Sequence, residues 1–103
     1  MRTIKQLIEN NKKVYVYLNG RAMGYRFLSD AEREGFRFGD GVKPSEREPG
    51  DIMALISETE ICYVGWAGRM CYHNDPNAIR VDYEKYIDGA ENYTLSLPAC
   101  SLK

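Results

Sequence analysis

Short apolar runs of strand length most constrain what this chain can fold into. Residues 14–18 alternate aliphatic and aromatic side chains, and residues 52–56 and 61–66 are apolar runs of similar length. Runs of this kind, rich in β-branched and aromatic residues, are typical of strands that are buried substantially on both faces. Because only residues 57–60 separate the second run from the third, we expect those two runs to form a hairpin.

One longer segment, residues 21–34, has helical periodicity. Its apolar face carries Met23, Phe27, Leu28 and Ala31, and its charged residues Arg26, Asp30, Arg33 and Glu34 fall elsewhere. Asn19 is suited to cap the start of a helix, and Gly35 is suited to end it. The pattern predicts one main amphipathic helix with a single buried stripe.

The other predicted elements are shorter. They are a helix at 3–9 capped by Thr3, a strand at 36–38 followed by a turn at 39–41, a polar surface loop at 42–50, a bend at 65–68, strands at 69–73 and 78–83, and a helical turn at 84–87. This order, with its mostly short connections, predicts a two-layer α+β fold, in which an antiparallel sheet of about four to five strands packs against one main amphipathic helix. In a chain of 103 residues we expect a single α+β domain at 1–90 and a C-terminal tail at 91–103.

Composition excludes several classes of protein. No run reaches the length of a membrane span and residues 1–6 lack the apolar centre of a secretory signal, so we expect a cytoplasmic protein that does not enter the membrane. Three cysteines without a C-x-x-C pair fit neither a disulfide framework nor a zinc site. A formal net charge of -1 argues against binding to duplex DNA, although basic residues gather before residue 27 and acidic residues in 82–91. Those two ends either pair or are solvated, or they mark an anion-binding face.

No pattern for catalysis is present in the sequence. The phosphate loop, the G-x-S-x-G elbow and the H-E-x-x-H motif are all missing, and neither paired carboxylates nor a calcium loop can be identified. A nucleophilic pair of Cys71 with His73 would lack a third group to orient the imidazole. We therefore expect no catalytic residues, no metal and no cofactor.

One set of residues is suited to an anionic, aromatic ligand such as a nucleotide. Arginine, lysine and histidine side chains bind phosphates, and aromatic rings stack on bases. The predicted ligand-binding residues are Arg37, Lys43, Arg47, Trp66, Arg69, Tyr72 and His73. We expect them to border one cleft if the turn at 39–41 and the bend at 65–68 meet, whereas Trp66 in the core is the structural alternative.

Four stretches of the chain carry a resemblance to a protein family. They read FLSDAEREGF (27–36), GDGVKP (39–44), YVGWAG (63–68) and RVDYEKY (80–86). The chain resembles a family of small proteins from phages and mobile elements of Gram-positive bacteria over roughly residues 3 to 89. This resemblance implies a phage or mobile-element setting, in which chains of this size are often counter-defence proteins.

The resemblance and the residues together give an expected function. We expect a small non-enzymatic binding protein that sequesters a nucleotide-derived immune signalling molecule. The alternative is a protein-protein inhibitor that binds a host defence protein directly, and a small enzyme ranks last. A sponge for a nucleotide would need a basic pocket, often completed across a homo-oligomer, whereas an inhibitor would need an exposed patch with aromatic anchors.

Overall fold

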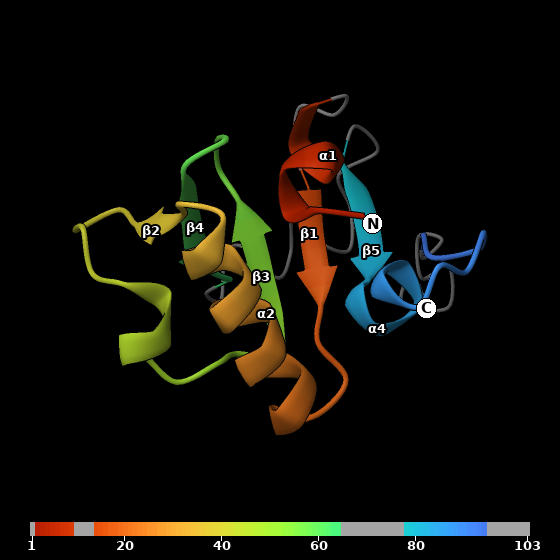
Figure 1. Cartoon of the computed structure of the whole chain (residues 1–103), viewed down its shortest axis with the longest axis horizontal. Coiled ribbons are helices and arrows are strands. Elements are labelled where there is room, and N and C mark those ends of the chain that lie inside the picture. Colours follow the sequence, from red (N-terminus) through yellow and green to blue (C-terminus); the bar gives the residue numbers. More distant parts are fainter. Residues whose placement is uncertain (1, 10–13, 65–77, 95–103) are drawn as a thin grey trace, which may run out of the picture.

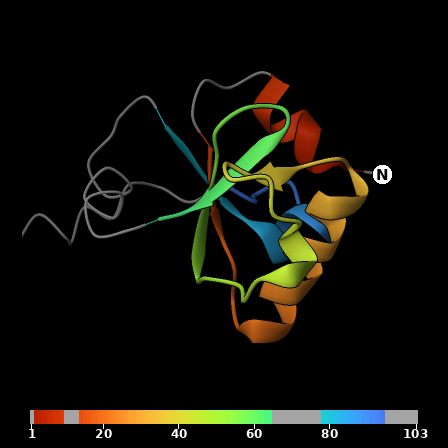
Figure 2. The same ribbon diagram turned by 90° about the vertical axis from the view of Figure 1, so that its left-hand side faces the viewer.

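The computed structural model describes residues 2–9, 14–64 and 78–94 of the chain. The helices are α1 (Ile4–Glu9), α2 (Arg21–Arg33) and α4 (Tyr83–Ile87), with a short 3-10 helix η1 (Pro44–Glu46), and the strands are β1 (Val14–Tyr17), β2 (Arg37–Phe38), β3 (Ile52–Leu55), β4 (Glu60–Tyr63) and β5 (Ile79–Asp82). The strands form one five-stranded sheet, and the three α-helices lie on the same side of it (Figure 1, Figure 2). The predicted α+β fold with one main helix is confirmed.

The directions of the strands correct one detail of the prediction. The sheet order is β2-β4-β3-β1-β5, and the central pairs β1–β3 and β3–β4 are antiparallel, as expected. Both outer strands run parallel to their neighbours, β5 beside β1 and β2 beside β4, so the sheet is mixed. Parallel neighbours need a long crossover connection, and here each connection runs through other elements of the fold. Strands that follow one another along the chain, such as β2 and β3, are therefore not always neighbours in the sheet.

The core lies between the sheet and the helices. Alternate residues of the strands face the helices, and α2 packs Phe27, Leu28 and Ala31 against them. The strand residues on this side are Val14, Val16, Phe38, Met53, Leu55, Ile61 and Val81. The opposite face of the sheet is apolar too, since Tyr15, Ile52 and Ala54 are buried there. The central strands β1 and β3 are thus buried on both faces, as their alternation of apolar residues predicts.

Helix α1 begins with the predicted Thr3 cap, and a carboxylate from another part of the chain also binds its first turn. The Thr3 hydroxyl accepts a hydrogen bond from the Gln6 amide at 3.3 Å, and the Gln6 side chain accepts one from the Thr3 amide at 2.9 Å. This reciprocal pair satisfies two N–H groups that a helix start leaves unpaired. Two further amides at this end, those of Ile4 and Lys5, donate to the carboxylate of Glu34 at 2.9 and 3.0 Å. The first helix is therefore tied to the end of α2.

The ends of α2 depend on glycines. The predicted cap Asn19 is wrong: the N-cap residue is Gly20, with φ of 93° and no side-chain hydrogen bond, because the chain enters the helix through a conformation that favours glycine. Gly35 follows the helix with φ of 94°, as expected, and lets the Phe36 amide bond back to Ala31 at 2.9 Å. A second correction concerns Asp30: the periodicity predicts it off the apolar face, but it is buried at 4% exposure because Arg26, Arg33 and Tyr83 donate hydrogen bonds to its carboxylate.

Residues beyond position 90 still contact β5 of the α+β domain. The Asp82 amide donates to the carbonyl of Tyr93 at 2.8 Å, and Thr94 forms an isolated bridge with Val81. The bend predicted at 65–68 and the strand predicted at 69–73 lie outside the described residues. Among the helices of the described ranges, none has the length and apolar character needed to cross a membrane.

Candidate functional site

A loop and a helix approach each other closely at one end of the sheet. A Cβ atom added to Gly24 of α2 would lie 2.5 Å from the Cβ of Pro49 and 2.9 Å from its Cγ. No larger residue fits there without a shift of the loop, so the glycine lets the segment before β3 lie directly on the helix. This contact holds the neighbouring residue, Glu48, beside the first turns of α2.

Glu48 then joins three elements through hydrogen bonds. Its carboxylate accepts from the Arg21 guanidinium at 2.5 Å and from the Tyr25 hydroxyl at 3.1 Å, and its carbonyl accepts from the Tyr63 hydroxyl. The hydrogen bonds from Arg21 and Tyr25 lower the pKa of the Glu48 carboxyl, so this group is ionised at neutral pH. Glu48, a loop residue, thus accepts hydrogen bonds from side chains of both α2 and β4.

These side chains remain accessible although they are bonded to one another. Tyr25 is 44% exposed and Tyr63 is 41% exposed. Beside Tyr63, the ring of Phe38 stacks at a centroid distance of 5.1 Å, and the Arg47 guanidinium lies 4.7 Å from the centre of that ring. We call the surface formed by Arg21, Tyr25, Arg47, Glu48 and Tyr63 the tyrosine patch.

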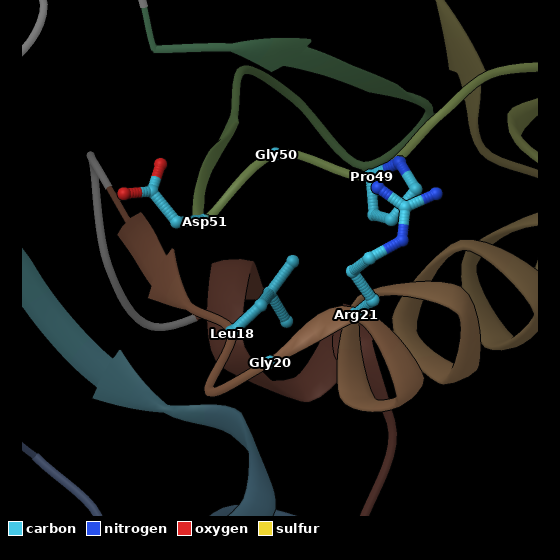
Figure 3. A pocket seen from close by; sticks show the side chains of 6 residues that line it. All are labelled: Leu18, Gly20, Arg21, Pro49, Gly50 and Asp51. Atoms are coloured by element: carbon cyan, nitrogen blue, oxygen red, sulfur yellow. The ribbon is translucent and has the colours of Figure 1, made fainter.

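A shallow cavity adjoins the tyrosine patch (Figure 3). Its volume is about 170 Å³, and Leu18, Gly20, Arg21, Pro49, Gly50 and Asp51 line it. Leu18 points toward the loop at Gly50, and the Arg21 guanidinium lies next to Pro49 (Figure 3). The floor is apolar and charged side chains stand on the rim, an arrangement that accepts an apolar group from outside.

Three of the residues predicted to bind a ligand lie in the described part of the chain. Arg47 pairs with Asp40 and covers Phe38. Arg37 is the neighbour of Phe38 on β2, and its guanidinium donates to the carbonyl of Phe36 at 2.8 Å. Since neighbouring residues of a strand face opposite sides, Arg37 and the Phe38 ring that Arg47 covers lie on different faces of β2.

Lys43 lies with Arg37 near a carboxylate of α2. The Glu32 carboxylate accepts two hydrogen bonds from Ser45, at 3.0 Å from the amide and 2.5 Å from the hydroxyl. These bonds, and then the nearby charges of Lys43 and Arg37, lower the pKa of Glu32. Arg37 and Lys43 are therefore close to one carboxylate and Arg47 to another. The other four predicted residues, Trp66, Arg69, Tyr72 and His73, lie outside the described residues.

Sequence reasoning did not select the tyrosines of the patch. One signal was available for Tyr25, because it stands one turn after Arg21 on α2 and away from the apolar stripe of the helix. No comparable signal marks Tyr63, because strand β4 is apolar along most of its length.

Cys62 is the cysteine that the structure describes, and it is a free, half-buried thiol on β4. Burial, and secondarily the charge of Glu60, raise its pKa. A thiol that acts as a nucleophile at neutral pH has its pKa lowered instead. Among the described residues, no group of three or more histidine, cysteine or acidic side chains could hold a metal ion.

The fold and this surface define a small α+β domain whose exposed tyrosines and arginines are held in place by hydrogen bonds. No family model, no curated protein and no solved structure matches the chain.

Proposed function

We propose that this chain is a small non-enzymatic binding protein that acts by binding a partner protein through the tyrosine patch. Its resemblance to small phage and mobile-element proteins supports a counter-defence role, with a host defence protein as the partner. The observation that carries the proposal is the network around Glu48, which fixes two exposed tyrosines and an arginine from separate elements.

The composition of the patch supports a protein partner. Tyrosine and arginine are enriched among residues that dominate the binding energy of protein interfaces, usually near a pocket from which water is excluded. Tyr25 and Tyr63 present large rings, and the cavity beside Arg21 adds an apolar recess. Tyrosine also contributes contact area at a low cost in conformational entropy.

The network around Glu48 supports binding in a second way. A side chain that is already fixed loses little conformational freedom when a partner docks, so more of the contact energy remains as affinity. Hydrogen bonds hold Tyr25 and Tyr63 before any partner arrives. The cavity volume of about 170 Å³ also lies below the roughly 300 Å³ at which pockets for small molecules begin.

Site-specific crosslinking tests this proposal. A photo-crosslinking amino acid is placed at position 25, 63 or 56 of the full chain, and the protein is expressed in a Gram-positive host. Ile56 is the matched control, because it is 51% exposed and lies at the other end of β3 from the patch. We expect positions 25 and 63 to label the same host protein and position 56 to leave it unlabelled. Identical products from all three positions, or none from 25 and 63, would contradict the proposal.

A second candidate function is sequestration of a nucleotide-derived signalling molecule. The observation in its favour is the Arg47 guanidinium, which is held by Asp40 and the Phe38 ring and whose side chain is still 33% exposed. Incubation with a panel of cyclic nucleotides and ADP-ribose derivatives, followed by mass spectrometry of what stays bound, tests it. Sequestration would be favoured if the protein retains an unchanged nucleotide and the Arg47→Ala variant does not retain it. Release of an altered nucleotide would point to an enzyme.

A further inference from the structure

A second cavity lies on the other flank of α2, away from the tyrosine patch. The patch side of the helix meets the loop through Gly24 and Glu32, whereas this side meets α4 through Asp30. The cavity has a volume of about 140 Å³, and its lining consists of Arg2, Thr3, Arg26, Asp30, Arg33, Glu34, Tyr83 and Ile87. Three of these residues are arginines, which come from the N-terminal segment and from two turns of α2.

A buried carboxylate positions two of the arginines. Asp30 accepts from the Nε of Arg26 at 3.1 Å, from an Nη of Arg33 at 2.5 Å and from the Tyr83 hydroxyl at 2.6 Å. The Asp30 side chain is only 6% exposed, whereas those of Arg26 and Arg33 are 48% and 64% exposed. Each guanidinium is therefore fixed along one edge and open to solvent along another.

Arg2 is fixed from the opposite side. Its Nη1 donates to the carbonyl groups of Tyr86 at 3.0 Å and Ala90 at 2.7 Å. Its guanidinium also lies over the rings of Tyr86 and Tyr93, at 5.3 and 4.8 Å from their centres. The two hydrogen bonds to described residues both come from one nitrogen of the guanidinium group, which carries five N–H donors on three nitrogens.

The charges of the cavity favour an anion. Three guanidinium groups face two carboxylates, and both carboxylates are already occupied by donors of the protein. Asp30 accepts from three side chains, and Glu34 accepts the amides of Ile4 and Lys5 at the start of α1. The amides that bond Glu34 are neutral and do not offset its charge, so the three guanidinium groups and two carboxylates leave one positive charge in excess.

We propose that the cavity between α1, α2 and α4 binds a phosphate group, held by the free edges of Arg2, Arg26 and Arg33. Arginine binds phosphate oxygens through paired N–H donors, and it does so most strongly where the guanidinium is held in place beforehand. The volume of about 140 Å³ suits a single phosphate rather than a whole nucleotide. The group comes either from inorganic phosphate or from the end of a larger phosphate monoester, and the test separates these sources. The inference does not depend on the tyrosine patch.

Calorimetric titration of the full chain tests the inference with inorganic phosphate, AMP and adenosine as probes. We expect phosphate to bind, adenosine not to bind, and added salt to weaken binding. If the site serves a monoester, AMP binds more tightly than phosphate, and if it serves free phosphate, AMP binds equally or more weakly. Absence of phosphate and AMP binding at millimolar concentration, or adenosine binding as tightly as AMP, would overturn the inference.

Substitutions of the lining arginines test whether phosphate binds in this cavity. Arg33→Gln leaves Asp30 with Arg26 and Tyr83 as donors, and it should weaken phosphate binding roughly 10- to 100-fold, the loss of one hydrogen bond to a charged group. Arg26→Gln is the second variant, in case the first unfolds. Lys85→Gln is the control, because it removes the same charge from an exposed residue of α4 that does not line the cavity. Equal loss in the control, or full binding in both arginine variants, would overturn the assignment.

Discussion

The buried hydroxyl group of Tyr83 makes the stability of the fold depend on pH in the alkaline range. Burial, and then its hydrogen bond to Asp30, raise the pKa of Tyr83 well above the usual tyrosine value, and burial raises the pKa of Tyr86 to about 12. In the unfolded chain both groups titrate near pH 10. Above that pH the unfolded chain therefore binds fewer protons than the folded chain, and stability falls as pH rises.

We expect the free energy of unfolding to decrease from about pH 10 upward, with a slope of up to about 1.4 kcal/mol per pH unit for each of the two tyrosines. Urea titrations followed by circular dichroism at several alkaline pH values measure this slope. Tyr83→Phe should cost about 1.5–3 kcal/mol at neutral pH for the lost hydrogen bond to a carboxylate, and it should flatten the alkaline slope. A slope that Tyr83→Phe leaves unchanged would show that Tyr83 does not cause it.

Gly24 gives a second prediction at this scale. Alanine normally favours a helix interior over glycine by about 1 kcal/mol. At position 24 the new methyl group would meet Pro49 at 2.5 Å, so we expect Gly24→Ala to destabilise the protein by about 1–3 kcal/mol through overpacking. Ser29→Ala, at an exposed position of the same helix, is the control and should be neutral or slightly stabilising. Chemical denaturation compares the two, and a stabilised Gly24→Ala would contradict the close contact.

Helix α2 is the element that joins the core to both surfaces. Phe27 and Leu28 face the sheet, while its two flanks carry the tyrosine patch and the cavity of three arginines. We expect Leu28→Ala, at a position that is 1% exposed, to lower the free energy of unfolding by about 2–5 kcal/mol. Tyr25→Ala, half-exposed on the same helix, should cost much less. Equal losses would mean that Leu28 does not contribute to the core as its burial indicates.

The elements predicted correctly are those whose signal is local. Periodicity identified α2, and the apolar runs on either side of residues 57–60 identified the hairpin of β3 and β4. The sheet neighbours of β2 and β5 were not predictable in this way, because pairing between distant segments leaves no trace in local periodicity. The burial of Asp30 was missed for the same reason, since its partner Tyr83 lies in another element. The tyrosine patch likewise arises where three separate elements meet.

The whole molecule needs its last described strand to complete the sheet. We expect a chain that ends before β5 to lose cooperative unfolding, because it lacks one neighbour of β1 and the buried residues Val81, Tyr83 and Tyr86. Adding a peptide of residues 78–94 should restore a cooperative transition, measured by circular dichroism. A truncated chain that melts cooperatively by itself would show that β5 and α4 are dispensable.

The position of β1 inside the sheet also matters while the chain is being made. Strand β1 is synthesised first, yet both of its neighbours, β3 and β5, follow much later in the sequence. During translation the nascent chain therefore carries an apolar strand with both edges unpaired, and one edge stays open until β5 leaves the ribosome. An exposed edge of this kind is a template for pairing with other chains. The interval before β5 has been synthesised and can pair is thus the stage at which β1 is most exposed to aggregation.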